Sequence, residues 1–381
     1  LVGADILPWV TNTSEGKQKF QSTQKVLSYA FAIFEGFAYV GMGAISPAKA
    51  GFLPFIVVVF QVALGGILVI LMDEVISKWG FGSGVSLFIL AGVSQSLLIQ
   101  LISPFISSTP TVLWFMPGAA TQAPVGILPH LLSGRSAASI PPKLIGLVST
   151  VAVFLVAVYA QAMRVEIPLT FGNVRGFGQK WPLKFVYTNV IPVLFVGALT
   201  SNFQLLASLL TRQGVDLSIG GFYIVGQYTG GGSPAASSLI YYLTPPTGFI
   251  NNIIDTVTTM TLQIPPSQFI QVLTYTSFYI VGAAIFSLFW MRTSGQDARS
   301  VAEQIANIGM KVPGHRKDTR VIEKILNRYI PPLAVLGGAF VGFLAAVANY
   351  TNAYGSGTGI LLAVMIAYQL YEEIAKKHME E

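Results

Sequence analysis

Residues 52–72 read FLPFIVVVFQVALGGILVILM, a run of 21 residues without a charged side chain. About 20 apolar residues are long enough to cross the hydrocarbon core of a bilayer as an α-helix. Lipid offers no partners for backbone N–H and C=O groups, and a closed β-barrel would instead show short alternating segments. The stretch therefore predicts a membrane-spanning helix.

The composition of the whole chain extends this prediction. Of 381 residues, 53% are hydrophobic and 10% are charged, and the mean hydropathy is +0.64. Soluble domains carry roughly 25% charged residues, so a soluble fold of this length could not cover its surface. The absence of cysteine excludes disulfides, thiolate metal sites and cysteine nucleophiles. We therefore expect an all-α, polytopic transmembrane bundle.

Eight segments are apolar and long enough to span a membrane. They lie at about 26–45, 52–72, 84–103, 144–163, 186–209, 267–291, 331–349 and 358–375. Pro54, Pro192 and Pro332 are then expected near helix entrances, where a missing N–H costs least.

The connections between these spans differ in basic charge. Alternating them across the membrane places 18 of the 22 Lys and Arg residues on one side and 4 on the other. The basic side comprises 1–25, 73–83, 164–185, 292–330 and the tail 376–381. The positive-inside rule assigns this side to the cytosol. We therefore predict a multi-pass protein of the cell membrane with a cytosolic C-terminus.

Two spans open with the same kind of step. Gly82-Ser83-Gly84 leads into the third span and Gly357-Thr358-Gly359 into the eighth, and the predicted topology makes these spans cross in opposite senses. Such an echo is typical of inverted repeats, in which two halves enclose a central path. The second half has five spans and the first only three, so we expect one span and most of another upstream of Leu1.

Residues for enzyme chemistry are sparse. The histidines, His130, His315 and His378, all fall in predicted loops or the tail, which argues against His-based acid–base chemistry or a zinc site within the membrane. We therefore expect no enzyme activity, cofactor or metal.

Glu35 is the one acid in the middle of a predicted span. An ionisable residue at membrane depth points to a functional site. The alternative is a protonated Glu that hydrogen-bonds a neighbouring helix. Its expected partners are the polar residues Thr200, Ser201, Asn202 and Gln204, which could equally serve only to hold helices together.

Basic charge is concentrated in the two long connections, 164–184 and 292–328. Topology and attraction to anionic lipid headgroups explain the charge but not the length, because far fewer residues suffice to join two helices. We therefore interpret the connections as a docking surface, with RNA phosphates as one target.

Several longer strings resemble the SecY family, whose members form the channel subunit of the Sec protein-translocation complex. The resemblance covers essentially the whole chain, and the string at 163–168 (MRVEIP) is similar to archaeal members. The matching strings are VEIPL at 165–169, WPLKF at 181–185, YTNVIP at 187–192, GFGSGVSLFI at 80–89, YIPP at 329–332, FVG at 340–342 and GSGTGILL at 355–362.

The resemblance implies an architecture of two inverted halves around a pore. The eight spans correspond to the family's third to tenth helices, and residues 1–10 to the end of a truncated second helix. Residues 11–103 form the N-terminal half, 104–143 an external loop and 144–375 the C-terminal half.

The resemblance also implies functional residues. Val85, Ile89, Leu194 and Leu362 resemble the aliphatic pore ring, a dewetting constriction that yields to a passing chain; taken alone, they would be assigned to core packing. Glu35 and Asn202, beside Thr200 and Ser201, resemble the polar lateral gate. The cytosolic positions that would dock a partner are Arg175, Lys180, Arg316 and Lys317.

The resemblance implies passive translocation of secretory polypeptides and lateral release of membrane segments. Expected partners are a SecE-like subunit, a SecG- or Secβ-like subunit, the ribosome including its rRNA, signal sequences with nascent polypeptides, and membrane lipids. The main rival is a secondary transporter with inverted repeats, but apart from Glu35 the spans offer almost no midplane charges for it. A membrane scaffold would leave the ring and gate unexplained.

Overall fold

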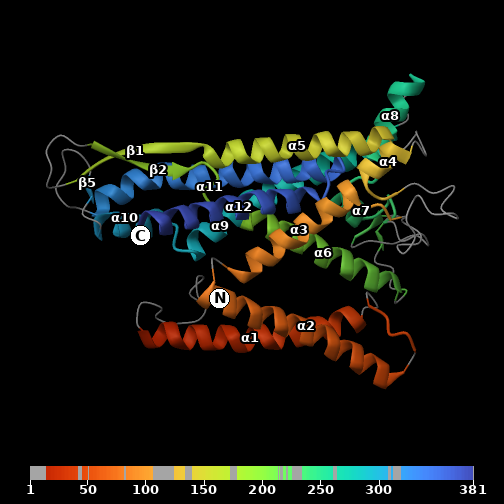
Figure 1. Cartoon of the computed structure of the whole chain (residues 1–381), viewed down its shortest axis with the longest axis horizontal. Coiled ribbons are helices and arrows are strands. Elements are labelled where there is room, and N and C mark those ends of the chain that lie inside the picture. Colours follow the sequence, from red (N-terminus) through yellow and green to blue (C-terminus); the bar gives the residue numbers. More distant parts are fainter. Residues whose placement is uncertain are drawn as a thin grey trace. The chain divides into compact units, whose positions relative to one another are not determined.

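The fold is a set of long helices with small strand elements (Figure 1), seen in a computed structural model. In the part of the chain that is described, there are twelve helices and five strands. The described residues are 14–41, 45–49, 51–80, 83–105, 124–133, 140–171, 178–212, 214, 218–219, 222–224, 234–260, 264–307, 310–311 and 319–380.

Within these residues, seven helices are long and apolar enough to cross a membrane. They confirm seven of the eight predicted spans. They are α2 (Phe52–Trp79), α3 (Gly84–Ile102), α5 (Ile140–Ala162), α6 (Ile191–Arg212), α9 (Pro266–Thr293), α11 (Thr319–Tyr350) and α12 (Gly357–Glu380).

The span expected at 26–45 falls largely on α1 (Ser14–Gly41). This helix is not among the seven, because no stretch of its described residues is both long and apolar enough, and residues 42–44 lie outside the described ranges. It stays a prediction. The short helices are α4 (Ile127–Ser133), α7 (Leu239–Leu243), α8 (Phe249–Thr259) and α10 (Ala298–Asn307).

The expected helix entrance at Pro332 is wrong, whereas Pro54 and Pro192 lie in the first turns of α2 and α6 as predicted. Helix α11 begins at Thr319, so Pro332 lies inside a helix and not at its entrance. The helix continues outward because Ile322, Leu326 and Ile330, spaced by four residues, are buried on one face. Helix α6 begins at Ile191 instead of 186, after a turn in which Asn189 has a positive φ of 56°.

The chain divides into two compact units, residues 1–89 with 369–381 and residues 90–368. In the first unit, α1 packs against α2. Gly36 allows this close approach, because a β-carbon there would lie 3.0 Å from the Val59 carbonyl oxygen. At the surface, the Nζ atoms of Lys25 and Lys78 each lie 2.6 Å from the Glu74 carboxylate.

The core of the second unit forms where α9 and α11 pack together. A β-carbon at Gly338 would lie 2.8 Å from the Ala283 carbonyl oxygen, and one at Gly342 would lie 2.5 Å from that of Tyr279. Gly338 and Gly342 form a GxxxG pattern, which lets two membrane helices approach backbone to backbone. The buried Val193 and Val196 bring α6 into the same core.

The basic connection after α5 forms a hairpin of β1 (Arg164–Phe171) and β2 (Gly178–Lys184). A third strand, β5 (Met310–Lys311), joins β1 and gives the order β2-β1-β5. Figure 1 shows these strands and α10 at one end of the second unit, and α4, α7 and α8 at the other. A separate two-stranded sheet pairs β3 (Ser218–Ile219) with β4 (Phe222–Tyr223).

Candidate functional site

Val85 lies in the first turn of α3, and Asp73 of α2 holds that turn in place. The Val85 N–H donates to Asp73 Oδ1 at 2.9 Å, and the Ser83 hydroxyl donates to the same atom at 3.2 Å. Gly84 is required between them, because a β-carbon there would lie 2.7 Å from Asp73 Cα. A carboxylate at a helix N-terminus satisfies N–H groups that otherwise lack partners. Ile89, four residues on, shares a face with Val85.

The start of α12 is tied in a comparable way. The Gly357 N–H donates to Asn349 Oδ1 at 2.8 Å, and Asn349 Nδ2 donates to the Tyr275 hydroxyl at 2.8 Å. Gly357 has no room for a side chain, since a β-carbon would lie 2.5 Å from Ala348 Cβ. Gly84 and Gly357 therefore both begin helices in which a backbone N–H of the first turn donates a hydrogen bond to a side chain of the preceding helix.

The four ring candidates all escape complete burial. Val85 is 44% exposed, and Ile89, Leu194 and Leu362 are half-buried. Their neighbours differ: Val193 beside Leu194 and Leu361 beside Leu362 are fully buried in the second unit's core. Val85 and Ile89 belong to the first unit, Leu194 and Leu362 to the second. Their convergence on one axis stays a prediction.

The polar gate candidates occupy different surfaces. Glu35 is exposed on α1, whereas its neighbour Gly36 is buried against α2. On α6, Ser201 and Asn202 are exposed, but Thr200 is 4% exposed and donates to the Val196 carbonyl at 2.9 Å. Thr200 is thus a packing residue of the helical core. Glu35 and Asn202 belong to different units, and their pairing stays a prediction.

Of the docking candidates, Arg175, Arg316 and Lys317 lie outside the described residues. Lys180 pairs with Pro168 in the β1–β2 register, and its side chain is not among those described.

Sequence reasoning missed the three-stranded sheet that joins the two basic connections. Ile167 of β1 and Leu183 of β2 are buried in a cluster with α10 and α11. The alternation of polar and apolar residues in Arg164-Val165-Glu166-Ile167 was a period-two signal that could have predicted the strand.

Tyr187 strengthens the connection between these two segments. Its hydroxyl donates to the Gln296 carbonyl at 2.8 Å. Burial, and to a smaller extent the charge of Asp297, raises the pKa of Tyr187 to about 12. The hairpin, α10 and the start of α11 therefore form one folded platform and not two separate loops.

Titratable residues that could bind a metal do not gather in the described ranges, where no group of three His, Asp or Glu side chains is found. His130 is buried in α4. His315 lies outside the described residues, as does the side chain of His378.

Comparisons with known proteins agree on one family. Residues 5–371 match the SecY family. Protein translocase subunit SecY of Methanothermobacter thermautotrophicus is 39% identical, covering 100% of this chain and 77% of the relative. The SecY of Methanocaldococcus jannaschii is 38% identical, covering 100% and 78%.

Solved structures give the same result. The chain is similar to a structure of SecY in which the plug domain stabilises the closed state of the translocation channel. The TM-score is 0.77 at 36% identity, and the match covers 99% of this chain and 78% of that one. It is also similar to Sec61 in the canine ribosome–channel complex from the endoplasmic reticulum, with TM-score 0.72, 36% identity and coverage of 99% and 77%.

Proposed function

The chain belongs to the SecY family, and on that premise we propose which of its residues close, open and dock the channel. Its relatives are protein translocase subunits and protein-conducting channels. The chain is accordingly a multi-pass membrane protein with a channel role in protein translocation, and it is not an enzyme. The function that the geometry supports best is translocation of secretory polypeptides across the membrane and lateral insertion of membrane segments.

The proposed closure is a ring of Val85, Ile89, Leu194 and Leu362. The observation that carries it is that all four side chains are incompletely buried, and that Leu194 and Leu362 lie beside the fully buried Val193 and Leu361. A narrow aliphatic constriction expels water and stops ions, yet its side chains can separate around a chain without breaking hydrogen bonds. Capping by Asp73 supports this role, because it sets the position of Val85 on a rigid first turn.

Site-specific photocrosslinking of a stalled nascent chain tests the ring. We expect crosslinks from probes at Leu194 and Leu362, and none from probes at the matched buried neighbours Val193 and Leu361. Equal crosslinking at ring and control positions would contradict the proposal, as would labelling of the ring positions by small solutes alone.

The proposed lateral gate uses Glu35 on α1 and Ser201 with Asn202 on α6, with Thr200 packed behind them. Exposed polar groups in apolar helices are its support. Interhelical polar pairs in membranes contribute about 0.6–2 kcal/mol each, which an arriving apolar signal helix can offset. Replacing Glu35 or Asn202 with Leu should therefore change how hydrophobic a signal sequence must be to enter.

Ser208→Ala is the matched control, because Ser208 lies on α6 outside the proposed gate and its hydroxyl donates to the Leu205 carbonyl of the same helix at 2.8 Å. The lowest hydrophobicity at which a signal sequence still enters the channel is measured with a series of signal sequences of increasing Leu content. A threshold unchanged in both Leu variants would refute the gate.

The basic connections are proposed to dock the ribosome. Sec61, at 36% identity, is described in a ribosome–channel complex, which supports ribosome association for this chain. We assign the contact with rRNA phosphates to Arg175, Lys180, Arg316 and Lys317. Charge reversal at Arg175 and Arg316 should weaken ribosome binding and flatten its salt dependence, whereas reversal of Lys49 on the opposite side should not.

The remaining features follow from the same premise. We propose that residues 11–103 and 144–375 form inverted halves joined by the external loop 104–143, with the tail 376–381 in the cytosol and the protein in the cell membrane. The matching ties at the starts of α3 and α12 support the inverted repeat. A SecE-like subunit would clamp the halves, and a SecG- or Secβ-like subunit would bind peripherally.

A further inference from the structure

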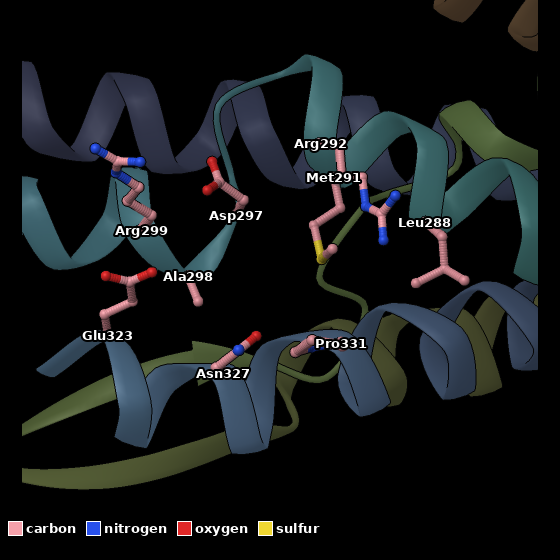
Figure 2. A pocket seen from close by; sticks show the side chains of 9 residues that line it. All are labelled: Leu288, Met291, Arg292, Asp297, Ala298, Arg299, Glu323, Asn327 and Pro331. Carbon is pink, nitrogen blue, oxygen red and sulfur yellow. The ribbon is translucent and has the colours of Figure 1, made fainter. Parts of the chain in front are cut away.

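A cavity of about 420 Å³ lies where α9, α10 and α11 meet (Figure 2). Its size falls within the range of small-ligand sites. The lining residues that matter for binding are Leu288, Arg292, Asp297, Glu323, Asn327 and Pro331. Every one of them belongs to the second unit.

The cavity crosses the boundary between apolar and polar surface. Helix α9, which is long and apolar enough to cross a membrane, ends at Thr293, so Leu288 belongs to its apolar run and Asp297 lies beyond it. Along α11, Glu323 and Asn327 precede the apolar run, and Pro331 lies at its start. A ligand in this cavity would therefore place one part at headgroup level and another against hydrocarbon.

Two opposite charges in the lining have neither an ion pair nor a hydrogen bond among the described residues. These are the exposed guanidinium of Arg292 and the half-buried carboxylate of Glu323. Figure 2 shows Arg292 extending from α9 toward α11, and Glu323 extending from α11 toward α10.

The other two charged residues of the lining have partners: Arg299 is in an ion pair, and Asp297 accepts a hydrogen bond. Arg299 Nε lies 3.4 Å from Glu303 Oε1. The Asp297 carboxylate accepts the Ser300 hydroxyl at 2.5 Å, at the start of α10. Beside the hydrogen-bonded Asp297, the cavity thus presents one cation and one anion that lack both kinds of partner, on different walls.

We propose that this cavity binds the headgroup of a zwitterionic aminophospholipid. Arg292 would bind the phosphate, since a guanidinium offers paired donors that match phosphate oxygens. Glu323 would accept hydrogen bonds from the primary ammonium, which carries three donors. Leu288 and Pro331 would contact the glycerol and the first methylenes of the chains. The site is separate from the proposed ring and gate residues, so it does not depend on them.

The headgroup chemistry gives the proposal a sharp test. Phosphatidylethanolamine and phosphatidylcholine share a phosphate, but the choline ammonium has no N–H to donate. Phosphatidylglycerol has the phosphate and no ammonium. The full-length protein, purified in detergent with its co-purifying subunits, would be titrated with each lipid, and bound lipid would be counted by native mass spectrometry.

We expect the unmodified protein to bind phosphatidylethanolamine about tenfold more tightly than phosphatidylcholine, as loss of one charge-assisted hydrogen bond predicts. Glu323→Gln should abolish that preference while keeping phosphate binding. Arg292→Ala should weaken binding of both lipids by about tenfold or more. Arg328→Ala, an exposed arginine of α11 outside the lining, is the matched control and should change neither.

The source of the headgroup is tested by adding soluble phosphoethanolamine. Competition at micromolar concentration would assign the site to a free metabolite, whereas competition only at millimolar concentration would assign it to lipid. Equal binding of phosphatidylethanolamine and phosphatidylcholine by the unmodified protein would overturn the proposal. So would a folded Glu323→Gln variant, judged by its thermal unfolding, that retains the preference, or protection of Arg292 from chemical modification by a co-purifying subunit after delipidation.

Discussion

Gly342→Ala should strongly destabilise the second unit, because it adds a methyl group where α11 touches the backbone of α9. A β-carbon at this position would lie 2.5 Å from the Tyr279 carbonyl oxygen and 2.8 Å from Ala283 Cβ. An ordinary carbon–oxygen contact needs about 3.4 Å, so α11 would have to move away from α9 by roughly 0.9 Å. Both obstructing atoms belong to, or are attached directly to, the α9 backbone, and neither can rotate aside.

The expected cost is about 1–3 kcal/mol for overpacking, at the upper end because the helices lose contacts along their length. The higher helix propensity of Ala returns about 1 kcal/mol. Gly197→Ala in α6 is the matched control, since a β-carbon there would have nothing within 4 Å, and it should be neutral or stabilising. The two variants should therefore differ by about 2–3 kcal/mol.

Unfolding in mixed micelles, titrated with sodium dodecyl sulfate and followed by tryptophan fluorescence, measures this difference. The reasoning is refuted if Gly342→Ala and Gly197→Ala unfold at the same detergent fraction.

The tied helix starts and the platform lead to three further predictions. Asp73→Ala removes the acceptor at the first turn of α3, so vesicles containing the variant should leak potassium at rest; tight vesicles would contradict the role given to that turn. Asn349→Ala leaves the Gly357 N–H without its partner and should cost about 1–3 kcal/mol, measured by thermal unfolding, with no change expected if water replaces the amide. Tyr187→Phe loses a hydrogen bond and should cost about 1 kcal/mol. Because the pKa of Tyr187 is raised to about 12, the folded state keeps its proton longer, so stability should fall as pH rises from about 10 toward 12, with a smaller slope in the variant.

The spans could be predicted because lipid imposes one simple rule on sequence, a run of apolar residues satisfied as a helix. This rule did not predict where α11 begins, because packing outside the hydrocarbon extends that helix. Helix α11 extends through the Pro331-Pro332 pair, since Ile322 and Leu326 continue a buried face on its polar side. Hydropathy cannot detect that continuation, because it averages over the faces of a helix.

The candidate site was harder to predict for a different physical reason. Leu194 and Leu362 are two aliphatic residues among many, and only their resemblance to a family distinguished them. Their partial burial beside the fully buried Val193 and Leu361 depends on the tertiary packing of α6 and α12. The burial of Thr200 could not be predicted either. Its neighbours in sequence are exposed, whereas Thr200 is buried and its hydroxyl donates to the Val196 carbonyl of the same helix.

The ties from Asp73 to α3 and from Asn349 to α12 have a mechanical consequence. A helix whose first turn is bonded to the helix before it cannot slide lengthwise or roll about its own axis without breaking that bond. The first turn of α3 should therefore move together with α2, and the first turn of α12 with α11. Neither helix start can then turn independently of the helix that precedes it.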